Sequence, residues 1–418
     1  MSIFEISSIL VTISAALMFI NFKFIRMPMT IGVMMLSLIF AILMILMSST
    51  SLVTNLSGMI EGIDFNKMLM HGMLSFLLFA GALHVDIQDL LEQKIIILIL
   101  ATFGVVFSTF LIGTISYYLF NNLFSFSIGY IYCLLFGAII SPTDPIAVLG
   151  ILKETNAPKS LKTTIAGESL FNDGVGVVVF SVILMIISSG EFHTSKILIL
   201  FAQEAIGGLI YGLIIGYIFY RLLKSIDNYP LEIMLTLALV MGGYSLSFHL
   251  PFHIHVSGPL AMVVAGLFIG NHGKMFAMSE TTHNQLFSFW ELVDEFLNAL
   301  LFVLIGFQLL NIVFDLNFIY SSIILIPIIL FVRFLGIKMT LLLLGSKNNL
   351  AKGSAYVMTW CGLRGGISIA LALSLDSSLK NTPEIYHLIL TVTFVIVSFS
   401  ILVQGLTSKK VVDSIIDV

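Results

Sequence analysis

Runs of about 20 apolar residues recur from one end of the chain to the other, and they limit its possible folds more than any other feature. A helix of ~20 residues crosses the ~30 Å hydrocarbon core of a bilayer. It also satisfies its own backbone N–H and C=O groups, which lipid cannot do. Only 10% of the 418 residues are charged and 58% are hydrophobic, whereas soluble domains carry about 25% charged residues. The sequence therefore predicts an all-α membrane protein and excludes a water-soluble globule.

Polar loops divide these apolar runs into thirteen expected spans. The spans lie at 3–22, 29–48, 67–84, 94–119, 127–152, 163–188, 196–223, 231–248, 256–270, 285–312, 318–344, 351–375 and 386–407. The whole chain, 1–418, is thus expected to form a single transmembrane domain.

The basic residues orient this arrangement, because cytoplasmic loops are enriched in Lys and Arg. With the N-terminus outside, thirteen of them fall in inner loops and only three in outer loops, namely Lys67, Lys196 and Lys380. We therefore expect the N-terminus outside and a short tail, 408–418, in the cytoplasm. The net charge of −4, without a clustered basic face, argues against nucleic acid as a partner.

The fifth expected span, 127–152, contains two prolines that flank a carboxylate: Pro142, Asp144 and Pro145. Proline lacks an N–H and clashes with the preceding turn, so two prolines should open the helix and free several carbonyls. Such backbone survives at this depth only where it is buried in protein or lines a wet cavity. We expect a broken helix with oxygen ligands around Asp144; the alternative is a kinked helix with a solvated Asp.

The sixth expected span, 163–188, carries a stripe of polar side chains. Glu168 and Asn172 are four residues apart, as are Ser169 and Asp173, so the four lie side by side on the helix surface. Ionisable groups at bilayer depth cost about 2.5–3.5 kcal/mol each and are functional by default. The alternative is a stripe that only joins helices, for which hydroxyls and amides would suffice.

The eleventh expected span buries Arg333 among aromatic and aliphatic residues. An unpaired guanidinium there would be very unfavourable, and Glu168 is the expected partner. The alternative is an arginine whose head group reaches the inner surface, near Lys338 and Lys347.

The twelfth expected span weakens at its middle, because three glycines surround Arg364: Gly362, Gly365 and Gly366. This second break comes seven spans after the first, so the two broken helices run in opposite directions. Paired breaks of opposite direction are typical of inverted-topology repeats. We expect one repeat at about 3–188, a linker span at 196–223 and a second repeat at about 231–407.

These motifs resemble the monovalent cation:proton antiporters, in particular the prokaryotic NhaP-type branch related to the animal sodium/proton exchangers. The resemblance covers essentially the whole chain. Three runs carry most of it: Ser141-Pro142-Thr143-Asp144-Pro145, Gly167-Glu168-Ser169-Leu170-Phe171-Asn172-Asp173-Gly174 and Gly362-Leu363-Arg364-Gly365-Gly366. It implies an NhaA-like fold with two crossing broken helices, and a secondary transporter rather than an enzyme.

The resemblance further implies a Na⁺ site, no cofactor, and a homodimer in the plasma membrane. The ligands would be Asp173, which binds either the cation or a proton, together with Asp144, Thr143 and Ser169. An asparagine before that aspartate goes with electroneutral exchange in this family, and here it is Asn172.

Other residues would support the site, again by resemblance. Asn172 would orient the two broken helices, and Glu168 would form a buried ion pair with Arg333. Arg364 would offset the helix dipoles at the second break.

The groups themselves indicate a mechanism. Burial disfavours the charged form of a carboxylate, so Asp173 can hold a proton that a cation replaces. Proton and cation then compete for one site. If the site is always occupied when it changes sides of the membrane, each cycle moves one cation in one direction and one proton in the other. This movement requires the bundle of broken helices to rock against the rest of the protein.

Several alternatives stay open at this point. Na⁺ and Li⁺ are favoured by the resemblance, but spacing does not exclude K⁺. An ion channel is another possibility, and it would pass far more ions than one per conformational cycle. An intramembrane aspartyl protease would use Asp144 and Asp173 as a dyad, although the two prolines and the second broken helix would then lack a purpose.

Two further groups have simpler interpretations. A histidine group after the eighth span has metal-ligand spacing, but we expect an ordinary structural loop: His249, His253 and His255. An acidic group is expected at the inner N-terminus of the tenth span, where negative charge suits a helix; it consists of Glu291, Asp294 and Glu295.

Overall fold

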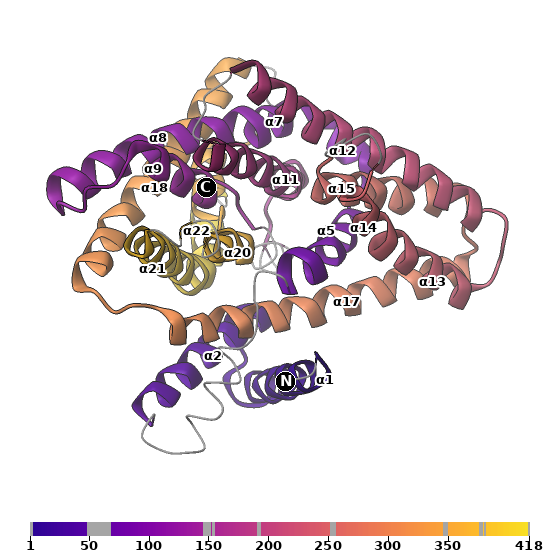
Figure 1. Ribbon diagram of the computed structural model, residues 1–418. Coiled ribbons are helices and arrows are strands. Elements are labelled where there is room, and N and C mark those ends of the chain that lie inside the picture. Colours follow the sequence, from indigo (N-terminus) through magenta and orange to yellow (C-terminus); the bar gives the residue numbers. More distant parts are fainter. Residues whose placement is uncertain are drawn as a thin grey trace.

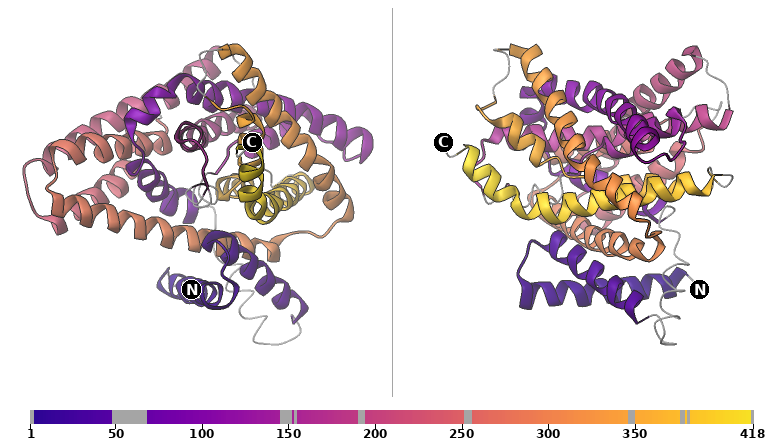
Figure 2. Two further views of the ribbon diagram at one scale, coloured as in Figure 1. Left: turned by 180° about the vertical axis from the view of Figure 1, so that it is seen from behind. Right: turned by 90° about the vertical axis from the view of Figure 1, so that its left-hand side faces the viewer.

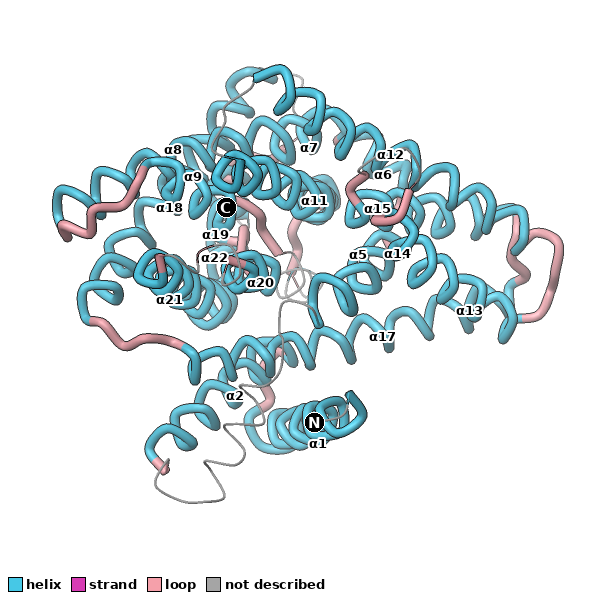
Figure 3. The backbone as a smooth tube through the Cα atoms, viewed as in Figure 1, coloured by secondary structure: helices cyan, strands magenta, loops and turns pink. Residues whose placement is uncertain are grey.

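In the computed structural model, helices make up most of the described residues, which are 3–47, 68–144, 152, 155–189, 194–250, 256–345, 350–375, 379 and 382–416. Over these residues it contains no β-strand, and helices joined by short loops fill the molecule (Figure 3). The predicted all-α membrane fold is confirmed.

The first half of the chain forms α1 (Ile3–Ile20), α2 (Met29–Leu46), α5 (Leu74–Leu83), α6 (Ile87–Glu92), α7 (Lys94–Ile99), α8 (Val105–Tyr118), α9 (Tyr130–Ile140), α11 (Lys159–Ser189) and α12 (Thr194–Leu223). The second half forms α13 (Tyr229–Ala238), α14 (Tyr244–Ser247), α15 (Gly258–Phe268), α16 (Lys274–Phe276), α17 (Glu280–Phe307), α18 (Leu316–Leu344), α19 (Ser354–Trp360), α20 (Gly366–Ser374), α21 (Pro383–Phe399) and α22 (Leu406–Ile416).

Short π-helical or 3₁₀ turns extend or join many of these helices. They are η1 (Asn21–Ile25), η2 (Met68–Met73), η3 (Leu100–Gly104), η4 (Leu119–Leu123), η5 (Leu239–Gly243), η7 (Ile269–Gly273), η8 (Gln308–Asn311) and η10 (Ser400–Gly405). Consecutive pieces therefore form longer rods, such as the rod from α21 through η10 to α22 (Figure 2).

Nine helical rods within the described ranges are long and apolar enough to cross a bilayer. The remaining four expected spans coincide with shorter helices, namely α5, α9, α15 and the pair α19–α20. The number thirteen therefore stays a prediction.

Several span edges differ by a few residues from the sequence expectation, and two of them have a clear local cause. α17 begins at Glu280 rather than near 285, because the Ser279 hydroxyl caps it by accepting a hydrogen bond from the Thr282 N–H at 3.3 Å. The last rod continues to Ile416 rather than ending near 407, because α22 packs against α19 and buries Ser408 and Val412.

α20 lies in the interior among longer helices, whereas α9 runs inward from the loop that joins it to α8 at the edge of the molecule (Figure 1). α17 runs along one side of this interior, and α1 and α2 pack on its outer side (Figure 1). The arrangement thus encloses the end of α9 and the start of α20, where the two helices are interrupted.

Glycines spaced four apart bring α12 close to α15. A Cβ at Gly212 would lie 2.5 Å from the Ala261 carbonyl oxygen, and one at Gly208 would lie 2.8 Å from the Ser257 carbonyl oxygen. Membrane helices lack a hydrophobic drive to associate, so close backbone packing of this kind holds them together.

Replacement of Gly212 by Ala should therefore destabilise the fold by about 1–3 kcal/mol, because one methyl group must force the backbones apart. The measurement is thermal unfolding in detergent. Gly242→Ala is the matched control, since a Cβ there meets nothing within 4 Å. An unfolding temperature of Gly212→Ala equal to or higher than that of the wild type would contradict this packing.

Candidate functional site

Two interrupted helices meet in the interior. α9 ends at Ile140 and continues as non-helical backbone to Asp144, while α19 ends at Trp360 and α20 begins only at Gly366. The two non-helical segments lie antiparallel, and the Asp144 N–H donates to the Leu363 carbonyl at 2.8 Å. Each break therefore satisfies a backbone group that the other leaves without a helical partner.

Arg364 joins the two breaks electrostatically. Its Nη1 donates to the carbonyls of Ser141 and Pro142, the latter at 2.8 Å. These carbonyls lie at the C-terminal end of α9, where the helix dipole is negative. The side chain is only 3% exposed, so the charge acts where water screens it little.

Asn172, on α11, holds the first break by both ends of its amide. Oδ1 accepts from the Thr143 N–H at 3.2 Å, and Nδ2 donates to Thr143 Oγ1 at 2.8 Å. Thr143 Oγ1 also lies 3.1 Å from Ser169 Oγ, within hydrogen-bond distance. The polar stripe of α11 thus fixes the backbone beside Asp144.

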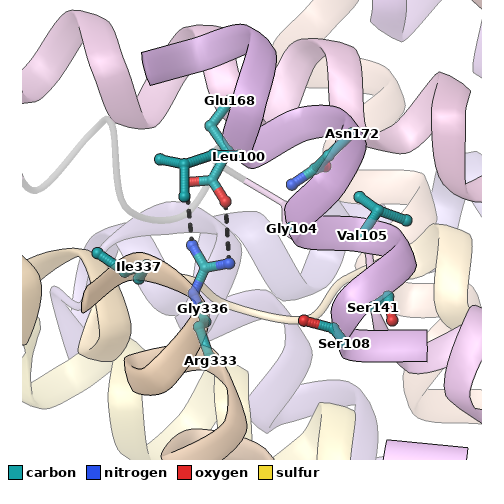
Figure 4. Close-up of a pocket in the computed structure, with 10 residues that line it drawn as sticks. All are labelled: Leu100, Gly104, Val105, Ser108, Ser141, Glu168, Asn172, Arg333, Gly336 and Ile337. Carbon is teal, nitrogen blue, oxygen red and sulfur yellow. Dashed lines mark hydrogen bonds and ion pairs between the residues drawn. The ribbon is translucent and has the colours of Figure 1, made fainter. Parts of the chain in front are cut away.

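Glu168 and Arg333 form a bidentate ion pair between α11 and α18 (Figure 4). Nη1 lies 3.0 Å from Oε1 and Nη2 lies 3.2 Å from Oε2. Arg333 Nε also donates to the Met358 carbonyl at 3.2 Å. Because Arg333 is buried here, the alternative in which its head group reaches the inner surface is excluded.

A small hollow lies beside this ion pair, with room for about one water molecule. Glu168, Asn172, Arg333, Ser108 and Ser141 contribute its polar lining (Figure 4). It is too small to be an ion pathway, and the carboxylate that we expected to bind the cation is not part of its wall.

That carboxylate, Asp173, is 7% exposed and receives no hydrogen bond from the residues that the structure describes. Asp144 lies beside it, because the preceding residue, Thr143, contacts Ser169 and Asn172 on the same stretch of α11 that carries Asp173. Two carboxylates in one buried region repel each other unless a cation or a proton lies between them. This pair is the best candidate for a cation site.

Glycines of the second break make room for two charged groups. A Cβ at Gly365 would collide with the Asp144 carboxylate, and a Cβ at Gly362 would collide with the Arg333 guanidinium. From the sequence, these glycines indicated only a weak helix. Their contacts show that any larger residue would displace Asp144 or Arg333.

The structure thus brings together all the expected site residues that it describes. Pro142 packs against Gly176 at the first break, whereas Pro145 lies outside the described residues. So do His253 and His255, while the Nδ1 atom of His249 lies 3.0 Å from the Ser245 carbonyl oxygen.

One expectation is wrong. The acidic group from Glu291 to Glu295 does not open a helix, because α17 already begins at Glu280. The residues lie well inside α17, so a favourable interaction with the helix N-terminus does not explain them.

Crossed broken helices with buried carboxylates, in an all-helical membrane protein, define a secondary transporter of small ions. Residues 9–413 match the model of the sodium/hydrogen exchanger transmembrane family. The chain belongs to this family, whose members are transporters rather than enzymes.

Its similarity to individual proteins extends over most of its length. It is 49% identical over 405 residues to the Na⁺/H⁺ antiporter NhaP of Pseudomonas aeruginosa, which covers 95% of this chain and 93% of the relative. It is 35% identical over 344 residues to the Na⁺/H⁺ antiporter NhaH of Halobacillus aidingensis, which covers 81% of each. The solved sodium proton antiporter MjNhaP1 of Methanocaldococcus jannaschii has the same fold, with a TM-score of 0.73, 20% identity and coverage of 98% of this chain and 97% of that one.

Removing either partner of the buried ion pair should destabilise the protein by about 3–5 kcal/mol, because an uncompensated charge is left behind. Glu168→Gln combined with Arg333→Gln should cost less than the sum of the two single changes. Thermal unfolding of the three variants in detergent measures this. Strictly additive losses would mean that the two side chains do not stabilise each other.

Proposed function

We propose that the protein exchanges Na⁺ or Li⁺ for H⁺ across the plasma membrane. The observation that carries the proposal is the pair of carboxylates beside the crossing of two broken helices, with Asp173 buried and Asp144 half-buried. The two antiporters named above, with 49% and 35% identity over most of the chain, support the same activity.

The cation would lie between the stripe of α11 and the first break. Its proposed ligands are the oxygen atoms of Asp173, Asp144, Thr143 and Ser169, which suit a hard cation. Asn172 and Arg364 hold the breaks in place, as their contacts with Thr143 and with the carbonyls of α9 support.

Competition at Asp173 gives the exchange. A proton neutralises the carboxylate in one half-cycle and the cation does so in the other. The charge of the buried site is therefore compensated each time the site changes the side of the membrane that it faces. Because Asn172 cannot titrate, one positive charge moves in each direction. We infer a 1:1 electroneutral cycle.

Alternating access would come from rocking of the broken-helix bundle against the rest of the protein. The ion pair between Glu168 and Arg333 ties α11 to α18, which supports their movement as one body. We further propose a homodimer with the N-terminus outside and the C-terminus in the cytoplasm.

The proposed carrier is tested by Asp173→Asn, which keeps the shape and removes the titratable charge. Proton release on addition of sodium to sealed vesicles should vanish, while the variant still folds. Lithium and potassium, added in turn to the wild type, identify the preferred cation. If Asp173→Asn still exchanges sodium for protons, the carrier is another group and Asp144 is the next candidate.

Competition also predicts a pH dependence in the wild type. On the acid side, one proton must leave for each cation bound, so the apparent cation affinity should weaken about tenfold for each unit that the pH falls. Cation titrations of vesicle transport at several pH values measure this. An affinity that stays flat across the acid range would exclude a shared site.

Electroneutrality predicts that membrane voltage has little effect. Sodium-driven proton flux should be nearly the same when a potassium diffusion potential of either sign is imposed on vesicles, because each half-cycle moves the same charge. A flux that rises with one sign and falls with the other would show net charge movement.

A further inference from the structure

The π-helical turn η10 holds two buried polar side chains against the second break. Ser400 and Gln404 are 1% and 3% exposed. Side chains four residues apart share a face of a helix, and here both face the segment between α19 and α20. Single π-helical turns occur often at functional sites.

The two side chains satisfy the backbone groups that this break leaves free. The Arg364 N–H donates to Ser400 Oγ at 2.9 Å, and Gln404 Nε2 donates to the Trp360 carbonyl at 2.9 Å. Ser400 Oγ donates in turn to Gln404 Oε1 at 2.7 Å. Trp360 ends α19, and Arg364 comes two residues before α20, so the bonds bracket the whole interruption.

Hydrogen-bond chemistry allows only one direction along this chain. A carbonyl only accepts, so the amide nitrogen of Gln404 must face Trp360 and its oxygen must face Ser400. The single hydroxyl proton of Ser400 then goes to Gln404, and its lone pair is left for the Arg364 N–H. A donor at one end of residue 404 and an acceptor at the other are both required.

The opposite face of the same segment forms the candidate site. Leu363 accepts the Asp144 N–H, and the Arg364 side chain bonds the carbonyls of Ser141 and Pro142. The position of residues 361–365 therefore sets the position of Asp144. We propose that Ser400 and Gln404 are positioning residues that hold the second break in the register that Asp144 and Arg364 require.

The positioning role rests on the proposed function only in experiments that measure transport. Hydrogen exchange of the Arg364 N–H tests the role without any transport measurement. Ser400→Ala removes the acceptor of the Arg364 N–H. Amide hydrogen exchange of the segment 361–365 in the full-length protein in detergent should become about threefold to tenfold faster, as expected for the loss of one net hydrogen bond. Ser400→Thr, which keeps the hydroxyl, should restore slow exchange.

Ser398→Ala is the matched control. Ser398 precedes η10 in the same rod, and its buried hydroxyl has no partner within the described part of the chain. Its removal should leave exchange of 361–365 unchanged. Equal exchange in Ser400→Ala and wild type, or an equal increase in Ser398→Ala, would overturn the proposal.

Gln404→Glu tests the donor requirement. A protonated glutamic acid can donate to Trp360 and accept from Ser400, as glutamine does, whereas an ionised one cannot donate. The ratio of the variant's sodium-driven exchange rate to that of the wild type should therefore fall as the pH rises. A ratio that is constant with pH would contradict the role of Gln404. If Ser400→Ala fails to fold, this measurement on Gln404→Glu tests the proposal instead.

Few other charges surround this position. Arg364 lies in the break itself, and Arg333 lies behind Gly362. α2, which packs against η10, carries no charged residue. α21, which continues into η10, carries Glu384 and His387 near its opposite end, and α22 carries Lys409, Lys410 and Asp413.

The two levels of inference can fail separately. If wild-type vesicles release no protons on addition of sodium, lithium or potassium, the proposed function is wrong, and the hydrogen-exchange comparison still decides whether Ser400 holds the break. If the wild type exchanges ions and Ser400→Ala leaves the segment unchanged, only the positioning role is lost.

Discussion

Non-helical backbone in the middle of a membrane protein must find partners within the protein, and the rest of this structure depends on how it does so. The two breaks solve the problem jointly. The Asp144 N–H bonds the Leu363 carbonyl, and Arg364 reaches back to the carbonyls at the end of α9. Because each break completes the other, neither can be moved or removed alone. The carboxylate of Asp144 is held at the place where they cross.

Successive layers of contacts stabilise this crossing. Asn172 fixes the first break from α11, and the ion pair of Glu168 and Arg333 ties α11 to α18. Arg333 in turn contacts the Met358 carbonyl in the last turn of α19 and packs against Gly362 in the second break. These contacts connect one break to the other through the two long helices α11 and α18, and the two breaks also contact each other directly. A closed circuit of this kind transmits displacement, because no member can shift without straining the next.

Much of this arrangement can be predicted from the sequence. Prolines beside Asp144, the four-residue spacing in α11 and a lone arginine among apolar residues each have local causes that the chain records directly. Other contacts join residues more than two hundred positions apart, and no local pattern encodes them: the bond from Arg364 to Pro142, and the fit of Gly365 against Asp144. The acidic residues of α17 were wrongly predicted to lie at a helix N-terminus. The polar residues after Ser279 resemble a loop in the sequence, although they form the first turns of α17. Gln404 gave no signal because it lies at the expected end of a span, where polar residues are ordinary.

The two hydrogen bonds between the Asn172 amide and Thr143 have a consequence for any protein of this fold that would carry an acid at this position. An ionised carboxylate can accept from the Thr143 N–H, but it has no hydrogen to give to Thr143 Oγ1. Only the protonated acid can copy both bonds of the amide. In such a protein, loss of that proton would loosen the first break at the same moment as it adds a charge to the site. Coupling stoichiometry and the stiffness of the hinge would then be governed by one titration, whereas the amide of Asn172 keeps them independent.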